Sequence, residues 1–181
     1  GRKLLRGVRC VHTHLKNEPL TQDDLTDLAI LRLDFMAAIG VKEDGLPANI
    51  YTAHILPYNP AGKTCEGGEP MPFHAFDIEM DGFAASLEEE MGRAITRDVR
   101  GTSERAILVS VSTKHKETQM ESLEELKELA RTDNVAVLDT VCQRPEKLNP
   151  KYLMGTGKIK ELVINALQKN ASMIIFDQEL T

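Results

Sequence analysis

The chain has 181 residues, of which 41% are hydrophobic, so it can bury one large core or two small ones. Its formal net charge of −6 excludes a uniformly basic nucleic-acid binder, although a local basic patch is compatible with it. Aromatic residues make up 4% and Trp is absent, so platforms for stacking single-stranded bases are scarce. No run of about 18 apolar residues is present, which predicts that no segment spans a membrane. Three scattered cysteines predict free thiols in a reducing cytoplasm.

The first half mixes strands and helices. Apolar and polar side chains alternate over 6–14, which is typical of a strand. Thr21 can cap free N–H groups and Asp24 would lie at the positive end of a helix dipole, so we expect a helix to start there. The other elements expected in this half are strands at 36–41 and 50–56, a Gly- and Pro-rich loop at 57–72 and a charged helix at 86–97.

The second half alternates strands with helices. Strands are expected at 106–112, 135–141 and 173–176, and helices at 120–131 and 158–169. This alternation predicts right-handed crossovers and a parallel sheet. The continuous apolar content of 135–141 predicts a strand that is buried on both faces.

The predicted fold class is therefore α/β, with two small domains. The first, residues 1–100, is a mixed α/β piece, and the second, residues 101–181, is a parallel β-α-β-α-β unit. The segment Arg100–Ser103 is the expected linker. Because strands are expected close to both ends of the chain, we interpret it as a fragment in which the first domain is truncated at its start and the second at its end.

A local excess of positive charge surrounds a glycine-rich turn in the second half. Residues 142–160 contain five basic residues and a single acidic residue, Glu146. Glycines before a helix let the backbone approach an anion, and the first helical N–H groups lack partners. We therefore expect a phosphate to bind here; the alternative is a tight turn whose lysine is solvated. The candidate phosphate-binding residues are Arg144, Lys147, Lys151, Gly155, Gly157 and Lys158.

Gly62-Lys63-Thr64 resembles the end of a phosphate-binding P-loop but lacks the rest of it. The pattern requires a glycine five residues before Gly62, where Pro57 stands. Pro57 and Pro60 have no N–H group with which to cradle a phosphate. We assign no catalytic residue, and we do not expect this chain to hydrolyse a nucleotide by the P-loop mechanism.

His12 and His14 form a more specific pattern than the Gly-Lys-Thr segment does. Two residues at i and i+2 on a strand point to the same face, and Asp24 at the following helix start could bring a carboxylate to them. Two imidazoles and one carboxylate, with a fourth position open, suit zinc better than magnesium. The alternative is a pair of polar residues at a strand end, followed by an ordinary helix cap.

The second half resembles the N-terminal domain of the HflX-type GTPases, over roughly residues 104–181. The elements Gly-x-Gly-Lys-x-x-Glu-Leu and Phe-Asp-x-Glu-Leu, in this order and spacing, carry most of the resemblance. The matching segments are Ala106–Ser110, Leu123–Leu126, Pro150–Leu162 and Ala171–Thr181.

The resemblance implies a cytoplasmic GTPase that binds the large ribosomal subunit and helps to split or rescue stalled ribosomes. In such proteins this domain precedes a helical linker and a Ras-like GTPase domain, which would bind GTP and Mg²⁺ and is missing from this chain. The chain itself is then expected to be a non-catalytic module that contacts ribosomal RNA or a nucleotide. That role would use Lys158 and the loop from Arg144 to Lys151.

The first half resembles, over Leu5–Val41, the N-terminal extension of longer members of the same family. It also resembles the metal motif of JAMM/MPN-type metallopeptidases, which implies His12, His14 and Asp24 as ligands and Thr21 in place of a serine. Leu15 stands where that motif has proline, the segment between His14 and Thr21 is one residue short, and the general-base glutamate would precede Gly1. The alternative function is therefore a JAMM-like metal-dependent hydrolase or, as we expect, an inactive remnant of one, in which zinc binding is retained at most weakly.

Overall fold

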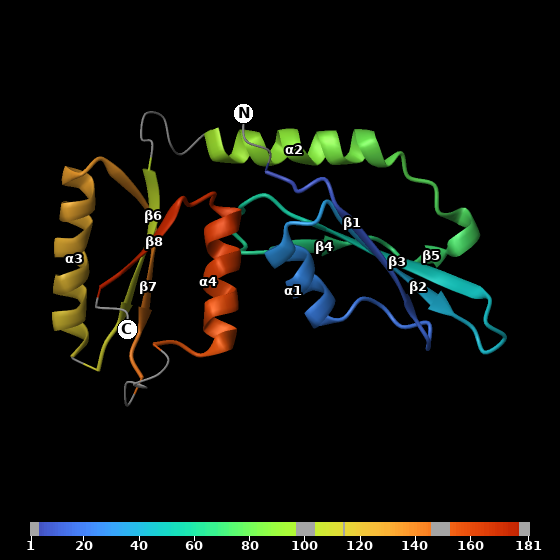
Figure 1. Cartoon of the computed structure of the whole chain (residues 1–181), viewed down its shortest axis with the longest axis horizontal. Helices are drawn as coiled ribbons and strands as arrows, with labels where there is room; N and C mark the ends of the chain where they lie inside the picture. Colours follow the sequence, from blue (N-terminus) through green and yellow to red (C-terminus); the bar gives the residue numbers. More distant parts are fainter. Residues whose placement is uncertain (1–3, 97–103, 114, 146–152, 178–181) are drawn as a thin grey trace. The chain divides into compact units, whose positions relative to one another are not determined.

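The structure is a computed structural model that describes residues 4–96, 104–113, 115–145 and 153–177 (Figure 1). The chain divides into two compact units, residues 1–96 and 97–181, and each is described by itself. Both units combine helices with a β-sheet, and the sheet of the second unit consists of three parallel strands, so the predicted α/β class is confirmed.

The first unit contains a mixed sheet in the order β1-β2-β3-β4, with β5 also paired to β3. Strands β1 and β2 are parallel, and β3 runs antiparallel to each of its neighbours β2, β4 and β5. The elements are β1 (Arg9–His14), α1 (Gln22–Leu31), β2 (Phe35–Val41), β3 (Pro47–Ile55), β4 (Cys65–Gly67), β5 (Met71–Pro72), the 3-10 helix η1 (Phe73–Ala75) and α2 (Met80–Thr96).

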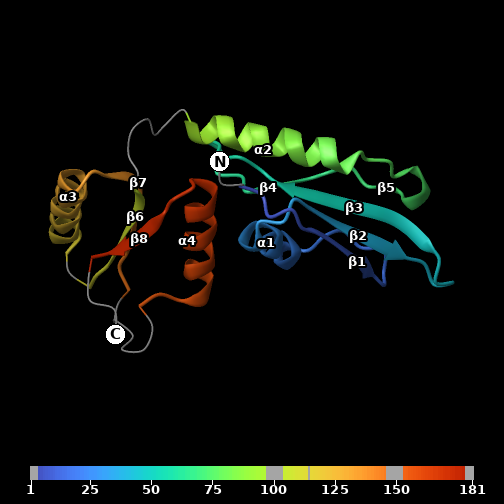
Figure 2. The same cartoon turned by 45° about the horizontal axis from the view of Figure 1, so that its top comes forward.

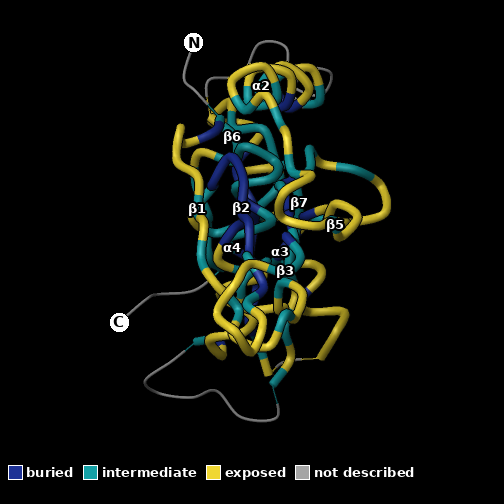
Figure 3. The backbone as a smooth tube through the Cα atoms, turned by 90° about the vertical axis from the view of Figure 1, so that its right-hand side faces the viewer, coloured by how far each residue is buried: buried dark blue, intermediate teal, exposed yellow. Residues whose placement is uncertain are grey.

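Strand β2 lies inside this sheet because it has no polar side chain to present to water. Phe35 and Ala37 face one side, where Phe76 and Phe83 pack against them. The alternate residues Met36 and Ala38 are also buried and belong to the opposite face. Figures 1 and 2 show α2 and α1 on opposite sides of the sheet, and Figure 3 shows β2 as a buried run beside the more exposed β1.

Gly40 near the end of β2 makes room for the loop that follows β1. A Cβ atom at Gly40 would lie 2.1 Å from Asn17 Oδ1 and 2.8 Å from the Asn17 Cα. Asn17 has a left-handed φ of 50°, and it accepts hydrogen bonds from the Asn49 N–H and the Tyr51 hydroxyl. Residue 40 therefore has to be glycine for this loop to lie against the sheet.

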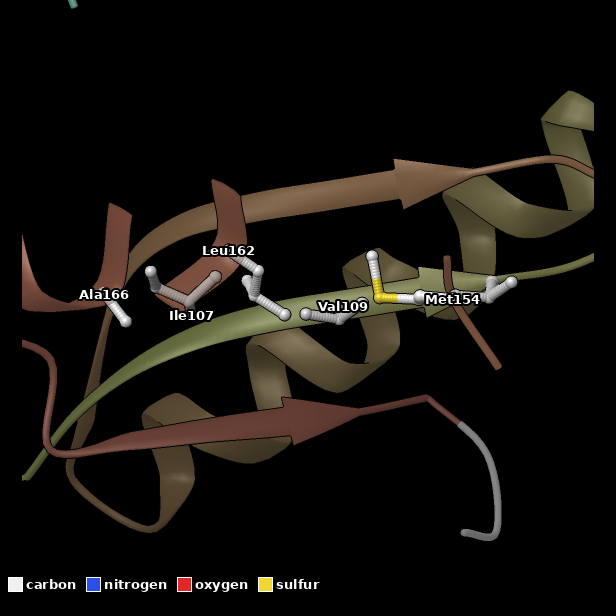
Figure 4. Close-up of a cluster of buried hydrophobic side chains, with 6 residues drawn as sticks. Ile107, Val109, Met154, Leu162 and Ala166 are labelled. Atoms are coloured by element: carbon white, nitrogen blue, oxygen red, sulfur yellow. The ribbon is translucent and has the colours of Figure 1, made fainter. Parts of the chain in front are cut away.

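The second unit is a three-stranded parallel sheet in the order β7-β6-β8. Its elements are β6 (Glu104–Val111), α3 (Lys116–Thr132), β7 (Val135–Gln143), α4 (Thr156–Gln168) and β8 (Met173–Phe176). The central strand β6 is buried without interruption from residue 106 to residue 111. Ala106 and Leu108 pack with Leu123 of α3 on one face. On the other face a second cluster includes α4, as Figure 4 shows, and its buried members are Ile107, Val109, Val111, Met154, Leu162 and Ala166.

The sequence-based prediction that the strand at 135–141, which is β7, is buried on both faces is wrong. β7 is an edge strand, and all but one of its residues are half-buried. β6 and β7 are similarly apolar, so composition does not decide which of them lies in the middle. The crossover through α3 places β7 on one side of β6, and the crossover through α4 places β8 on the other.

A β-bulge in β7 changes which face its side chains reach. Ala106 pairs with Val137 and Ile107 pairs with Asp139, so Leu138 is the extra residue. Val137 before the bulge packs with the cluster on the α3 side, whereas Val141 after it packs with the cluster on the α4 side. Without the extra residue both would share one face, because side chains repeat with a period of two.

The bulge thereby directs Asp139 towards α4. Asp139 Oδ2 accepts hydrogen bonds from Lys169 Nζ at 2.6 Å and from Asn165 Nδ2 at 2.9 Å, while Oδ1 accepts from the Thr140 N–H at 2.8 Å. Burial would raise the pKa of Asp139, but these bonds and the Lys169 charge outweigh it and lower the pKa below the ordinary value of 3.8.

Most expected elements lie within a few residues of their predicted positions. The exceptions are in the first unit, where α2 starts at Met80 instead of residue 86, and the predicted loop at 57–72 contains β4 and β5. The expected linker Arg100–Ser103 lies outside the described residues. Within the ranges that the structure describes, no helix is long and apolar enough to cross a membrane.

Asp139→Asn should destabilise the second unit by about 1–3 kcal/mol at neutral pH, because it removes the charged acceptor of two bonds from α4. The folded-state pKa is depressed, so this stabilisation is complete above the unfolded value of 3.8 and is lost as pH falls through the lower folded value. Hydrogen exchange of the 104–111 amides at several pH values would measure it. The exposed Asp133→Asn is the matched control, and equal exchange in both variants at neutral pH would contradict the prediction.

Gly40→Ala should destabilise the first unit by about 1–3 kcal/mol, since the new methyl group collides with backbone and side-chain atoms of Asn17. Gly92→Ala in α2 is the control with the opposite sign: a Cβ there meets nothing within 4 Å, so alanine should stabilise the helix by about 0.5–1 kcal/mol. Hydrogen exchange in β1 and β2 would report both effects. Unchanged exchange in Gly40→Ala would mean that the loop moves aside without cost.

Candidate functional site

The glycine-rich turn lies at the carboxyl end of the sheet in the second unit. β7 ends at Gln143, and the chain then returns to start α4 at Thr156. Met154, just before the helix, is buried beside Val109 and Val111 of β6, which fixes the position of the helix start. In open parallel sheets this edge is where ligands bind.

Neither glycine of the turn is required by the protein's own packing. Gly155 is the N-cap of α4 with an extended backbone at φ −67° and ψ 152°, which any residue can adopt. A Cβ atom at Gly155 or at Gly157 would meet nothing within 4 Å. Among the described residues no side chain caps this helix, and its first turn carries no acid. Within the described part of the chain the first N–H groups of α4 therefore have no side-chain acceptor, and they lie at the positive end of the helix dipole.

The structure describes two of the four predicted basic residues around this turn. Arg144 is exposed and directly follows β7. Lys158 is exposed in the first turn of α4, and its Nζ donates to Glu161 Oε2 at 2.6 Å. Both partners are more than half exposed, so this ion pair is weak and Lys158 can exchange it for another anion. Lys147 and Lys151 lie outside the described residues.

A polar network at the same edge was not predicted from the sequence. Gln119 of α3 is 3% exposed, and its Nε2 lies 3.1 Å from the Ser110 carbonyl oxygen and 3.2 Å from the Gln143 carbonyl oxygen. The Ser110 hydroxyl donates to Asp177 Oδ2 at 3.3 Å. The network joins the carboxyl ends of all three strands. The available signal was that Gln119 continues the apolar stripe of α3, four residues before Leu123.

Gly62-Lys63-Thr64 does not form a P-loop. It belongs to the connection between β3 and β4, and the strand β4 starts at Cys65 where a P-loop requires a helix. Lys63 Nζ donates to Glu66 Oε1 at 3.0 Å. The segment therefore lacks the loop-to-helix arrangement of a P-loop.

His12, His14 and Asp24 are brought together in the first unit. Residues 12 and 14 of β1 pair with Ala38 and Gly40 of β2, so both imidazoles share the sheet face that α1 covers. One ligand atom from each of the three side chains lies within 4.8 Å of the others. The two Nε2 atoms are 2.9 Å apart, and the carboxylate oxygens of Asp24 lie 3.5 Å from His12 Nε2 and 3.7 Å from His14 Nε2. Although the segment between His14 and Thr21 is one residue shorter than in the metallopeptidase motif, Asp24 still lies close to both histidines.

Asp24 is held in place by a capping box with Thr21. Asp24 Oδ2 accepts from the Thr21 backbone N–H and from its hydroxyl, each at 2.7 Å, and the Asp24 N–H donates back to Thr21 Oγ1. Burial raises the pKa of Asp24, but these hydrogen bonds and the nearby imidazoles lower it overall. The carboxylate is therefore ionised at neutral pH and faces both histidines.

Comparison with known proteins finds similarity in the second unit. The family model described as the GTP-binding GTPase N-terminal domain matches residues 120–181, which include β7, the glycine-rich turn and α4. Among the relatives of the chain, a protein named GTPase HflX from Lacrimispora saccharolytica is 37% identical over 84 residues, which cover 46% of this chain and 20% of the relative.

Two further proteins named GTPase HflX give similar matches. The one from Flavobacterium psychrophilum is 39% identical and covers 43% of this chain and 19% of its own length, and the one from Caldanaerobacter subterraneus subsp. tengcongensis is 36% identical and covers 43% and 18%. The chain thus spans about a fifth of the length of these curated relatives. The matches give no support to the metal-dependent hydrolase alternative. The second unit of the chain is thus similar to the N-terminal region of HflX-type GTPases.

Proposed function

We propose that this chain is a non-catalytic module of a cytoplasmic GTP-binding protein that acts on the large ribosomal subunit. Its second unit would bind phosphate groups through the first turn of α4. GTP and Mg²⁺ would be used by a GTPase domain in the same polypeptide, as the name GTPase HflX of its relatives suggests. The observation that carries the proposal is the pair of glycines at 155 and 157, which the fold itself does not require.

Glycines at these two positions suit an anion. A side chain at residue 155 or 157 would project into the space in front of the first helical N–H groups, where a phosphate oxygen would accept hydrogen bonds. The absence of an acid from the first turn also favours an anion, because Asp or Glu there would repel it. Because residues 155 and 157 have no side chains, the helix start favours a phosphate from another molecule over a cap from the chain itself.

The nearby cations add attraction that depends on salt. Lys158 is in the first turn, Arg144 is exposed at the end of β7, and Lys147 and Lys151 are close in the sequence. Each phosphate that such a residue neutralises releases a counterion, so binding weakens as salt rises. Ribosomal RNA is the ligand that we favour, since it presents many phosphates side by side, and a free nucleotide is the alternative source of the same group.

The charge-reversed variant Arg144→Glu/Lys158→Glu should bind large ribosomal subunits several-fold more weakly than the wild type. The slope of log K against log salt should also fall by roughly 1–2, because two phosphate contacts are lost. Lys127→Glu/Arg131→Glu on α3 is matched in charge and also removes two exposed ion pairs, and it should bind like the wild type. Co-sedimentation across a salt series would measure these affinities, with circular dichroism as the folding check.

Glu161→Gln tests the role of Lys158 in the opposite direction. It releases Lys158 from its partner and should strengthen binding by about twofold to fivefold. A parallel titration with ATP tests whether a free nucleotide is the source of the phosphate. Equal binding of the wild type and the charge-reversed variant to both ligands would remove this surface from the mechanism and leave the turn as a helix cap.

The purified chain should not turn over GTP. Gly62-Lys63-Thr64 leads into a strand, so it cannot present helical N–H groups to the phosphates of a nucleotide. Phosphate release from GTP should equal that of buffer, and Lys63→Ala should not change it. Turnover by the wild type that disappears in Lys63→Ala would contradict this prediction.

A further inference from the structure

We propose that a pocket in the first unit binds a small alkylammonium ion, which is an aliphatic chain that ends in a protonated amine. One wall of the pocket is the segment 5–9, where β1 begins, and the other wall is one side of α2. Asp34, directly before β2, also lines it. Its volume is about 390 Å³, which is within the range of pockets that bind small molecules. The pocket lies within the first unit, so it does not depend on the phosphate-binding surface.

The lining of the pocket carries more negative than positive charge. Three of its side chains are acidic, namely Asp34, Asp81 and Glu88, and one is basic, Arg9. Arg9 Nη2 pairs with Asp81 Oδ1 at 2.6 Å, and the two side chains are 40% and 88% exposed, so this pair is in contact with water. The charges of Asp34 and Glu88 have no basic partner within the lining. This surplus of negative charge attracts a cation.

The chain itself already uses Glu88. Its Oε1 and Oε2 accept hydrogen bonds from the backbone N–H groups of Leu4 and Leu5. Arg32 donates from Nε and Nη2 to the Leu4 carbonyl oxygen, and its positive charge attracts that of Glu88. Glu88 therefore holds residues 4 and 5 against α2, and Asp34 is the acid that is left to bind a ligand.

The carboxylate of Asp34 is buried, and one of its two oxygens is unused. Asp34 is 4% exposed, and its Oδ1 accepts a hydrogen bond from the Gly7 N–H at 2.8 Å. Among the residues that the structure describes, no donor reaches Oδ2 and no basic side chain pairs with Asp34. A carboxylate has room for about four hydrogen bonds, and burying one without partners is costly. A ligand in the pocket could supply both the missing donor and the missing positive charge.

Small and apolar residues leave space for the rest of such a ligand. Ala84 and Ala85 line the pocket from α2, and Leu5 lines it from the opposite wall. Gly7 has a left-handed φ of 74°, and a Cβ atom there would meet nothing within 4 Å. An aliphatic chain can pack on these apolar surfaces while its ammonium group donates to Asp34. The ligand that fits therefore has its charge at one end and a chain of a few carbons.

A metal ion fits this pocket less well. An ion bound by protein side chains needs about three ligand atoms close together. In the described part of the chain, the set of three such side chains whose ligand atoms lie within 4.8 Å of one another is His12, His14 and Asp24. The three acids of the pocket are not such a set, so they lie too far apart to share one ion. An ammonium group needs a single carboxylate.

The two walls of the pocket are tied together at several points. The ion pair between Arg9 and Asp81 joins the start of β1 to the first turn of α2, and Glu88 holds the chain two turns further along the helix. The Asp34 N–H donates to the Val8 carbonyl oxygen at 2.8 Å. A pocket whose walls are fixed before the ligand arrives loses little conformational freedom on binding.

The test is a titration of the full chain with n-butylamine at neutral pH, where the amine is protonated, with backbone amide NMR as the measurement. The amide signals of Gly7, Ala84 and Ala85 should shift and saturate in the millimolar range, which is usual for a ligand of about five heavy atoms. 1-Butanol has the same length without the charge, and it should bind at least about tenfold more weakly. Equal binding of the two, or signals that do not saturate with butylamine, would overturn the proposal.

Charge variants test the role of Asp34. Asp34→Asn keeps the size of the side chain and the acceptor for the Gly7 N–H, but it removes the charge and should weaken butylamine binding about tenfold to hundredfold. Asp44→Asn removes a charge from the exposed turn between β2 and β3 and should bind like the wild type. Wild-type affinity in folded Asp34→Asn, or an equal loss in Asp44→Asn, would show that Asp34 is not the binding group.

Filling the pocket tests its location without changing the charge. Ala84→Leu should abolish the shift at Gly7, because the larger side chain takes the place of the ligand. Ser86→Leu is the matched control, since residue 86 of α2 is exposed and does not line the pocket, and it should bind butylamine like the wild type. Circular dichroism would check the folding of each variant. Wild-type binding by folded Ala84→Leu would place the ligand elsewhere and overturn the proposal.

Discussion

Both units are built around a strand that has no polar face. β2 and β6 are buried nearly throughout, so each must be covered on both sides, and a helix supplies the cover on each side of β6. Covering a parallel sheet in this way requires a crossover helix between successive strands, and every such helix starts beyond the carboxyl end of a strand. The two candidate sites lie where two of these helices begin, after β1 and after β7. The positions of both sites therefore follow from the need to bury two apolar strands.

Single residues then change how the strands and helices of the second unit pack. The extra residue Leu138 turns the second half of β7 over, so that Val141 joins the α4-side core and Asp139 meets Lys169 and Asn165. The α4 helix is thus fixed to the sheet at its far end by the half-buried ion pair between Lys169 and Asp139, and at its start by the apolar side chain of Met154. Because both ends are held, the first turn of α4 keeps a fixed orientation while its own cap is left without a side chain. A rigid helix with an open start is what a phosphate-binding turn requires.

The sequence predicts these features unevenly, and the reasons are physical. The spacing of apolar residues correctly predicted the helices and strands of the second unit, and the Thr21–Asp24 pattern correctly predicted the start of α1. Both signals depend only on residues that are close in the sequence. The burial of β7 on both faces was predicted wrongly, since the order of β6, β7 and β8 depends on crossovers and not on composition. The bulge at Leu138 and the bonds of Gln119 to two strands depend on register between distant segments, which one sequence does not reveal. The meeting of His12 and His14 with Asp24 was predictable in part, because strand periodicity placed both imidazoles on one face, but only the folded connection brings the carboxylate to them.

The two sites share one topology and differ in how the start of the helix is capped. α1 and α4 each follow a strand and lead into a parallel strand of the same sheet, so both present unpaired N–H groups beyond a strand end. At α1 the chain supplies its own anion: Asp24 accepts a hydrogen bond from the Thr21 N–H, and its carboxylate lies beside the imidazoles of His12 and His14. At α4 the cap is Gly155, the first turn contains Lys158 and no acid, and the same N–H groups remain available to an anion from outside. The residues at the helix start thus decide whether the chain caps the first N–H groups of a crossover helix with its own carboxylate or leaves them without a side-chain cap.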